Sequence, residues 1–232
     1  MIIFAVGEYW SGNLDELKDY LRTTSYCMTL FDVPLHFHLA DASNSYDRYD
    51  MSKIFEGTLT RIAPQSAVAF VDNHDTQPGQ ALQSWVQDWF KVHAYALILL
   101  RDTFCPCVFY GDYKGIEHDQ KGQVPFLDEM VWIRSHLLDV DEMEDRLDDW
   151  HCIGWCTKGE HPVVVVMTNG WASGKSFSLP EYRSCSFVDI TRNDYKVKLD
   201  KDGTGTFTCL DGKCSIYMKE EDYISMKKEL KR

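Results

Sequence analysis

The fold is indicated most clearly by Ala67-Val-Ala-Phe-Val71 and by the helical pattern that follows it. Five consecutive apolar residues are typical of a strand that is buried on both faces of a parallel sheet. Apolar residues then recur at helical spacing over about four turns, ahead of a break at Pro106. They are Trp85, Trp89, Val92, Ala96, Leu97 and Leu100. A buried strand followed by an amphipathic helix predicts a β/α unit.

Similar units lie on both sides of this one. Apolar runs at residues 2–6, 30–35 and 107–110 predict three more strands. A helix is expected after the first run, because Asn13 can cap its start and leucines at positions 14, 17 and 21 share one face. Further helices are expected within residues 50–62 and in a segment that ends near Leu138. The pattern therefore predicts four β/α units on a parallel sheet, in a fold of the α/β class.

Four units are half of a (β/α)8 barrel, and a complete barrel takes about 250 residues. The segment up to residue 138 is too short for a complete barrel. We therefore expect half a barrel. A different four-stranded α/β sheet is the alternative that the pattern leaves open.

Beyond residue 139 the pattern changes to short β-type runs separated by Gly and Asn turns. The runs fall at residues 163–167, 184–188, 195–199, 204–208 and 215–218. We predict a partial barrel over residues 1–139, a small all-β antiparallel domain over 140–218 and a charged tail over 219–232. The acidic stretch 139–149 is expected to be a solvated linker. The tail is expected to be a frayed surface segment, because it holds few apolar residues.

Charge and composition exclude several classes of protein. Acidic side chains outnumber basic ones by 36 to 24, and the formal net charge of -12 argues against nucleic acid or an anionic membrane as a partner. No apolar run approaches the roughly 20 residues of a membrane helix, and the opening run is too short and uncharged for a secretory signal. We expect a globular, cytoplasmic protein whose eight cysteines are reduced thiols without a zinc site.

Functional groups in parallel α/β folds gather at the C-terminal ends of the strands. Glu8 follows the first predicted strand and Asp75 follows the third. Hydrolysis of a glycosidic bond needs an acid for the leaving oxygen and an anion beside an oxocarbenium-like centre, and these two carboxylates suit those roles. Trp10 offers a face on which a sugar ring can stack, and His74 a donor to a sugar hydroxyl. The structural alternatives are helix caps or ion pairs for the carboxylates, packing for Trp10 and a buried, backbone-bonded imidazole for His74.

The motif Phe70-Val-Asp-Asn-His-Asp-Thr-Gln-Pro-Gly79 resembles a conserved region of α-amylases of glycoside hydrolase family 13, of the bacterial liquefying type. The resemblance extends over residues 4–10, 30–36 and 106–112, in the family's order and spacing. It covers most of residues 2–138, and the region beyond is similar, more loosely, to the family's all-β C-terminal domain. The chain thus resembles the C-terminal half of a retaining α-amylase, with part of its TIM barrel.

This resemblance implies roles for the candidate residues. Glu8 takes the place of the acid/base, Asp75 that of the transition-state stabiliser and His74 that of its substrate-binding neighbour, on α-1,4-glucans such as starch. The family's nucleophilic aspartate, its nearby arginine and its principal calcium ligands belong to a portion that has no counterpart in this sequence. A retaining mechanism without its nucleophile cannot form the glycosyl-enzyme intermediate. The chain alone is therefore expected to be inactive, and its open half barrel to self-associate.

No metal ligand is predicted in this chain. On a predicted strand, His36 and His38 would share one face, but no third ligand is near them in the sequence. Related enzymes can bind a second calcium near Tyr49 and Asn169, at the junction with the β domain. Here His151 and Asn169 stand where a carboxylate would be expected, so that site lacks charge.

Three interpretations of the whole chain follow. The first is an α-amylase-type hydrolase, of which this chain is a partial product or one piece. The second is a catalytically dead glucan-binding or regulatory protein that keeps the sugar cleft. The third is a truncated or misassembled gene product that does not fold. The presence of Glu8, His74 and Asp75 favours the first, because a protein that only binds glucan does not need the acid.

Overall fold

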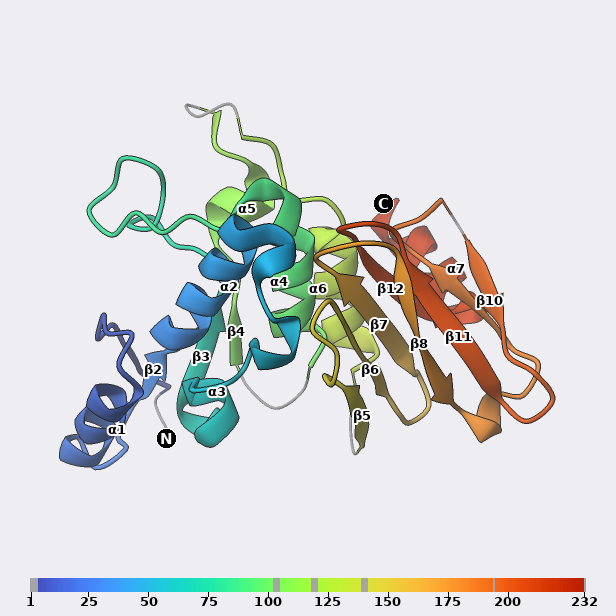
Figure 1. Ribbon diagram of the computed structural model, residues 1–232, viewed down its shortest axis with the longest axis horizontal. Coiled ribbons are helices and arrows are strands. Elements are labelled where there is room, and N and C mark those ends of the chain that lie inside the picture. The colour runs from blue at the N-terminus through green and yellow to red at the C-terminus, as the bar shows by residue number, and fades with distance from the viewer. Residues whose placement is uncertain (1–3, 102–104, 118–120, 139–141, 194, 232) are drawn as a thin grey trace.

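The computed structural model describes residues 4–101, 105–117, 121–138, 142–193 and 195–231. Figure 1 shows two units side by side, with helices around a short parallel sheet in the N-terminal part and antiparallel strands in the C-terminal part. Residues 2–3 of the first predicted strand and the expected boundary near residue 140 lie outside the described residues. No helix in the described part of the chain is both long and apolar enough to cross a membrane.

The parallel sheet consists of β1 (Val6–Gly7), β2 (Thr29–Phe31), β3 (Ala67–Phe70) and β4 (Cys105–Cys107), in that spatial order. Each pair of neighbours is parallel, which is how consecutive units are arranged in a (β/α)8 barrel. Every residue of β3 is buried, as its apolar run predicts. The predicted half barrel is therefore confirmed, with β1 first and β3 third in the sheet.

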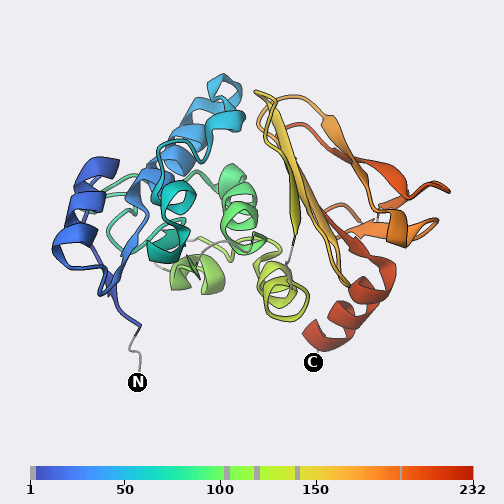
Figure 2. The same ribbon diagram turned by 90° about the horizontal axis from the view of Figure 1, so that it is seen from below.

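The helices of this unit are α1 (Leu14–Thr23), α2 (Val33–Ser45), α3 (Leu59–Ile62), α4 (Lys91–Leu99), α5 (Tyr110–Lys114) and α6 (Leu127–His136). The first forms as predicted, because Asn13 caps it by accepting a hydrogen bond from the backbone N of Asp15 at 3.0 Å. Figure 2 shows α4 and α6 between the parallel sheet and the antiparallel strands. Residues of both helices share one hydrophobic cluster with Trp155 and Val165 of the C-terminal unit. The two units therefore have a common core.

The predicted second strand was too long, and the expectation that His36 and His38 lie on a strand is wrong. Both belong to α2, where residues two apart in sequence do not face the same way. The helix begins early because the Asp32 carboxylate accepts a hydrogen bond from the backbone N of Leu35 at 3.2 Å and Pro34 stands in the first turn. The cap and the proline therefore end the strand at Phe31, and the rest of the apolar run is helical.

Two other predicted helices are shorter in the structure. Residues 50–62 form a 3₁₀ turn (Met51–Lys53) and the four-residue α3, instead of one helix. The pattern that begins at Trp85 becomes a 3₁₀ turn (Asp88–Phe90) followed by α4. The backbone N of Val86 donates to a side-chain oxygen of Asp72 at 3.3 Å, so this part of the chain is held in a loop by a tertiary contact.

In the described part of the C-terminal unit, every pair of neighbouring strands is antiparallel. A six-stranded sheet has the order β10-β9-β12-β7-β6-β5, and a two-stranded sheet pairs β11 with β8. Their bounds are β5 (Met143–Arg146), β6 (Cys152–Thr157), β7 (Val163–Thr168), β8 (Ser173–Ser178), β9 (Ser186–Asp189), β10 (Lys196–Lys198), β11 (Thr204–Cys209) and β12 (Cys214–Lys219). Phe177, Phe207 and Tyr217 pack between the sheets. The predicted small all-β antiparallel domain is confirmed.

Three strands of this domain were not predicted. In β6, Gly154 interrupts the apolar run, but a Cβ there would lie 2.6 Å from the carbonyl oxygen of Val165, so only glycine allows the strands to approach. The polar β8 belongs to the two-stranded sheet and exposes one face. The acidic stretch expected to be a linker contains β5, whose Asp145 binds Arg101 bidentately at 2.7 and 3.0 Å. The strand β5 is therefore held both by its pairing with β6 and by an ion pair to the half barrel.

The expectation of a frayed tail is also wrong. Residues from Glu220 form the helix α7 (Glu220–Leu230), and its Met226 is completely buried. Trp132 of α6 donates its indole N–H to the carboxylate of Glu229 at 2.7 Å. Tyr223 and Met226, three residues apart on one face of α7, pack on the common core, although the tail as a whole is highly charged.

Candidate active site

Both candidate catalytic carboxylates emerge at the C-terminal edge of the parallel sheet. Glu8 comes directly after β1 and is exposed, and Asp75 lies in the loop after β3 and is partly exposed. Since all four strands run in the same direction with β2 between the two, the residues share one edge of the sheet. The strand order is therefore the one that the sequence predicts. The acid and stabiliser roles of the two residues stay predictions.

The loop from Asp72 to Ser84 presents His74 and Asp75. Oδ1 of Asn73 accepts hydrogen bonds from the backbone N atoms of Asp75 (2.9 Å) and Thr76 (3.0 Å), which fixes the turn. Nε2 of His74 lies 3.5 Å from Oδ2 of Asp75, and the His74 side chain is 76% exposed. The alternative of a buried, backbone-bonded imidazole is therefore wrong for His74, which is accessible to a ligand beside Asp75.

A buried charge cluster holds the base of this loop. The ammonium of Lys91, on α4, donates to Oδ2 of Asp72 at 2.6 Å and to both carboxylate oxygens of Asp112, on α5, at 2.9 and 2.7 Å. The hydroxyl of Tyr95 donates to Asp112 at 2.7 Å, and that of Thr76 donates to Asp72 at 2.7 Å. Lys91 and the two aspartates are each less than a twentieth exposed. We call these five residues the Lys91 cluster, and it ties the loop after β3 to α4 and α5.

Burial of the Lys91 cluster shifts the pKa of one of its two aspartates, Asp72. Burial raises the pKa of Asp72 to about 7, although the neighbouring Lys91 and Thr76 act in the opposite direction. The indole of Trp85 covers the ammonium, with its ring centroid 3.5 Å from Nζ. The sequence patterns alone assign no role to the five residues of the Lys91 cluster. A signal was present, because a lysine inside an apolar helical pattern needs a buried partner.

His36 supports the same loop from α2. Its Nδ1 lies 2.6 Å from the carbonyl oxygen of Val71 and its Nε2 lies 2.7 Å from the hydroxyl of Ser84, so it spans both ends of the loop. Burial lowers the pKa of His36 to about 4, so the imidazole is neutral near pH 7. Because a carbonyl only accepts, Nδ1 carries the proton.

Trp10, predicted to stack on a sugar, lies in an aromatic cluster. Its ring centroid is 5.6 Å from that of His36 and 6.0 Å from those of Phe37 and Phe70. These contacts hold the segment after β1 against α2 and the end of β3, which is the packing role that the sequence left open. Trp10 remains partly exposed, and its contact with a sugar stays a prediction.

The junction near Tyr49 and Asn169, which the sequence predicts to lack charge for calcium, is held by hydrogen bonds. The amide Nδ2 of Asn169 donates to the carbonyl oxygens of Tyr46 and Tyr49, at 2.8 Å each, while its Oδ1 lies 3.1 Å from Nδ1 of His151. Calcium takes oxygen ligands, and here an N–H group points at the two carbonyls. Asn169 therefore joins the two units by hydrogen bonds.

The two histidines of α2 also have other partners. His36 holds the loop as described, and Nδ1 of His38 lies 2.5 Å from the hydroxyl of Tyr49. Within the described residues, no three His, Cys, Asp or Glu side chains form a group that could hold a metal ion.

The chain has clear relatives. A scan against models of protein families gives no match, but three curated proteins are each 38% identical to it. The glucan 1,4-alpha-maltohexaosidase of Bacillus sp. (strain 707) matches 94% of this chain and 43% of its own length. The alpha-amylase of Geobacillus stearothermophilus matches 96% of this chain and 42% of its own length. The cytoplasmic alpha-amylase of Escherichia coli (strain K12) matches 94% of this chain and 47% of its own length. The chain spans less than half the length of these relatives.

Solved structures share the fold. The alpha-amylase of Malbranchea cinnamomea has a TM-score of 0.66 at 17% identity and covers 94% of this chain with 51% of its own. An Anoxybacillus alpha-amylase has a TM-score of 0.65 at 17% identity, over 93% of this chain and 52% of its own. Half a barrel followed by an antiparallel domain is the fold that this chain shares with parts of these α-amylase structures. The chain is a homologue of the α-amylases of glycoside hydrolase family 13 and corresponds to the C-terminal half of their fold, as its motifs predict.

Proposed function

We propose that this chain supplies the acid/base and the transition-state stabiliser of an α-amylase-type hydrolase of α-1,4-glucans, such as starch, glycogen and maltooligosaccharides. The observation that supports this most is the shared position of Glu8 and Asp75 beyond the parallel strands β1 and β3. The relatives are named as α-amylases and a maltohexaosidase. A solved structure of similar fold, with a TM-score of 0.63, is a complex with maltotriose.

In this mechanism Glu8 donates a proton to the leaving glycosidic oxygen, and the anionic Asp75 faces the oxocarbenium-like centre. His74, exposed beside Asp75, donates to a sugar hydroxyl. The Lys91 cluster keeps the loop in place, so Asp75 does not have to be ordered when substrate binds. A covalent glycosyl-enzyme step needs another carboxylate. The motifs of this sequence assign none, so the chain by itself does not turn over glucan.

The test measures release of reducing sugar from soluble starch. The purified chain is assayed alone and mixed with a polypeptide that covers the N-terminal half of the Geobacillus stearothermophilus relative. We expect buffer-level release from the chain alone and turnover from the mixture. In the active mixture Glu8→Gln and Asp75→Asn should each lower turnover by about a hundredfold or more. The exposed Glu56→Gln should leave turnover unchanged and is the matched control.

Three outcomes would contradict this proposal. Turnover by the chain alone that disappears in Glu8→Gln would refute the claim that the chain lacks a nucleophile. Full activity of Asp75→Asn in the mixture would refute its role as stabiliser. Glucan binding without turnover in any mixture would favour a glucan-binding or regulatory protein.

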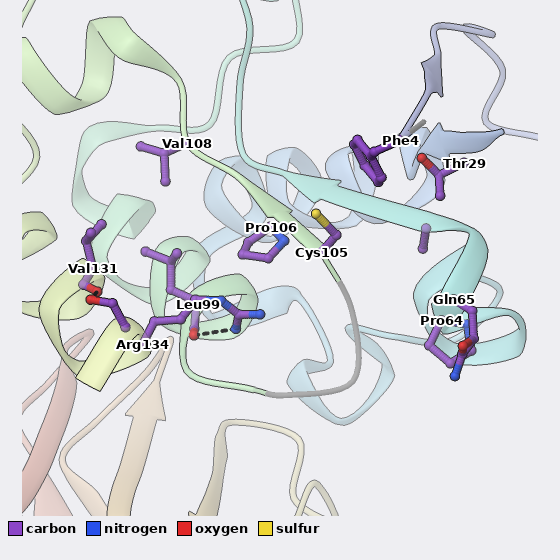
Figure 3. A pocket seen from close by; sticks show the side chains of 12 residues that line it. Phe4, Thr29, Pro64, Gln65, Leu99, Cys105, Pro106, Val108, Val131 and Arg134 are labelled. Carbon is purple, nitrogen blue, oxygen red and sulfur yellow. Dashed lines mark hydrogen bonds between the residues drawn. The ribbon is translucent and has the colours of Figure 1, made fainter. Parts of the chain in front are cut away.

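The half barrel leaves an open groove at the start of its strands (Figure 3). The groove has a volume of about 830 Å³ and is lined by Phe4, Thr29, Ala67 and Cys105, which precede or begin the four strands, and by Leu99 and Val131 of the helices. Phe4 is 64% exposed. In the described sheet, β1 and β4 each have a neighbour on one side only. An apolar groove beside unpaired strand edges is an association surface.

We further propose that a second copy of the chain covers this groove when the chain is on its own. Two four-stranded half barrels can close into eight strands, with β4 of one copy parallel to β1 of the other. Sedimentation velocity should show a dimer, and Phe4→Asp should shift it toward monomer. Addition of the N-terminal half of a relative should compete for the same edges. A monomer at all concentrations with a sharp thermal transition would refute the proposal.

We also propose a cytoplasmic location. All eight cysteines are free thiols in the structure, which suits a reducing compartment. The Escherichia coli relative, 38% identical, is named a cytoplasmic alpha-amylase. Fractionation of the source cells tests this, and recovery of the protein in the culture medium would refute it.

A further inference from the structure

Two buried thiols meet between the sheets of the β domain. Cys152 begins β6 of the six-stranded sheet, and Cys209 ends β11 of the two-stranded sheet. Both belong to the hydrophobic cluster between the sheets, and each residue is 1% exposed. Their thiols are hydrogen-bonded to each other. Sγ of Cys209 also lies 3.7 Å from the carbonyl oxygen of Ser173, its pairing partner on β8. A bond between the two sulfurs would therefore join two separate sheets.

The surroundings of Cys152 favour its thiolate. The hydrogen bond from Cys209 lowers the pKa of Cys152 to about 7. A hydrogen bond with Ser173 and the ammonium of Lys175 act in the same direction, against burial and the carboxylate of Asp149. The contact with Cys152 and burial raise the pKa of Cys209, which keeps the proton that it donates. A sizeable share of Cys152 is therefore thiolate near pH 7, the form that reacts with oxidants.

The neighbouring buried cysteines differ from this pair. Cys156 lies on the same strand as Cys152 and in the same cluster, but burial raises its pKa to about 12. Its thiol donates to the carbonyl oxygen of Thr157 at 3.3 Å. Cys214, on β12, packs in the other cluster, which is shared with the half barrel, and burial raises its pKa as well. Position and reactivity therefore both select Cys152 and Cys209.

We propose that Cys152 and Cys209 are a modification site, at which hydrogen peroxide converts the two thiols into a disulfide between the sheets. The thiolate of Cys152 attacks one peroxide oxygen, the O–O bond breaks and hydroxide leaves, so Cys152 becomes a sulfenic acid. The sulfur of Cys209 then attacks the sulfenic sulfur. An S–S bond forms, the S–O bond breaks, and the oxygen leaves as water with the thiol proton of Cys209. The two thiols lose two electrons, and the peroxide gains them.

Burial selects the oxidant. A bulky disulfide such as glutathione disulfide cannot reach side chains that are 1% exposed, whereas hydrogen peroxide is small enough to enter during local opening of the domain. The disulfide closes residues 152–209 into a loop, which removes conformational freedom from the unfolded chain. Oxidation should therefore stabilise the β domain. The proposal does not rest on the proposed hydrolysis.

Peptide mapping of the full chain tests the site directly. The chain is treated with hydrogen peroxide, its remaining thiols are blocked, and it is digested with trypsin without a reductant. Cleavage places Cys209 in the peptide 202–213 and both Cys152 and Cys156 in the peptide 147–158. We expect these two peptides to be cross-linked, and dithiothreitol to separate them. The cross-link should persist in the matched control Cys156→Ala and be absent from Cys152→Ala.

Thermal unfolding gives a second measurement. Peroxide treatment should raise the Tm by about 5–15 °C, as expected for a disulfide that closes a long loop in a protein of this size. Dithiothreitol should reverse the rise, and Cys209→Ala should show none. The triple variant Cys27→Ser/Cys105→Ser/Cys185→Ser removes the exposed thiols, so that disulfides between molecules do not contribute, and it should show the same rise.

Several results would overturn the proposal. A cross-link from Cys156 or Cys214 would mean that another pair reacts, and sulfinic acid at Cys152 without a cross-link would mean that Cys209 does not follow. Faster loss of the Cys152 thiol with glutathione disulfide than with peroxide would refute the oxidant. If an alanine variant does not fold, the peptide map of the unmodified chain still decides. Turnover of glucan enters none of these measurements, so failure of the hydrolase proposal leaves this one standing, and the reverse also holds.

Discussion

Replacement of Lys91 by methionine tests how the loop that carries Asp75 is held. Methionine fills much of the same volume but removes the ammonium that binds Asp72 and Asp112. The two carboxylates are 3% and 4% exposed, so water cannot take over the lost contacts. Loss of one partner from a buried ion pair typically costs about 3–5 kcal/mol, because the remaining charge stays buried without compensation. For a protein of this size that corresponds to a fall in Tm of about 6–20 °C.

The effect should depend on pH in a defined direction. The folded-state pKa of Asp72 is raised from 3.8 to about 7. The folded state therefore holds this proton more tightly than the unfolded state, so the stability contributed by Asp72 is complete below about pH 4 and is lost as the pH rises through about 7. Lys91 opposes the rise in pKa. Its removal should raise the pKa of Asp72 further, and the variant should lose more stability at pH 8 than at pH 5.

Thermal and urea unfolding at both pH values measure this effect. Lys91→Met/Asp72→Asn/Asp112→Asn should recover part of the lost stability, because it removes the uncompensated charges as well. Lys18→Met, which breaks an exposed pair with Asp15, is the control and should be nearly neutral. A Tm of Lys91→Met equal to that of the unmodified chain, or a loss of the same size at both pH values, would refute the reasoning.

Three further predictions concern the junction and the two ends of the chain. Asn169→Asp replaces the N–H donor by a carboxylate oxygen, which repels the carbonyl oxygens of Tyr46 and Tyr49. The Tm of this variant should fall in EDTA and recover with calcium, because calcium takes oxygen ligands. A fall in the Tm of the unmodified chain in EDTA would contradict our account of the junction. Met226→Ala should cost about 2–5 kcal/mol in urea unfolding, and a neutral result would mean that α7 is frayed. Asn13→Ala should cost about 1 kcal/mol by loss of the α1 cap, as the same unfolding measures.

The sequence determined the succession of elements and the candidate residues. Buried parallel strands are continuous apolar runs, so Ala67-Val-Ala-Phe-Val71 is visible without any knowledge of its neighbours. Glu8 and Asp75 could be selected because residues beyond such runs lie at the C-terminal edge of the sheet. The motif around Asp75 then identified the family. All of this information is local, within about ten residues of each strand.

Only the tertiary structure decided where the charges and caps find their partners. Asp32 begins α2, but its carboxylate also accepts from the backbone N of Thr60 at 2.6 Å, a contact that no local pattern contains. In the sequence, Lys91 is a charged residue within an apolar helical pattern. Its partners Asp72 and Asp112 come beside it only in the folded chain. Asn169 meets Tyr46 across 123 residues of sequence. Periodicity reports which face of an element is apolar, whereas the stability of a buried polar group depends on partners that only the folded chain brings together.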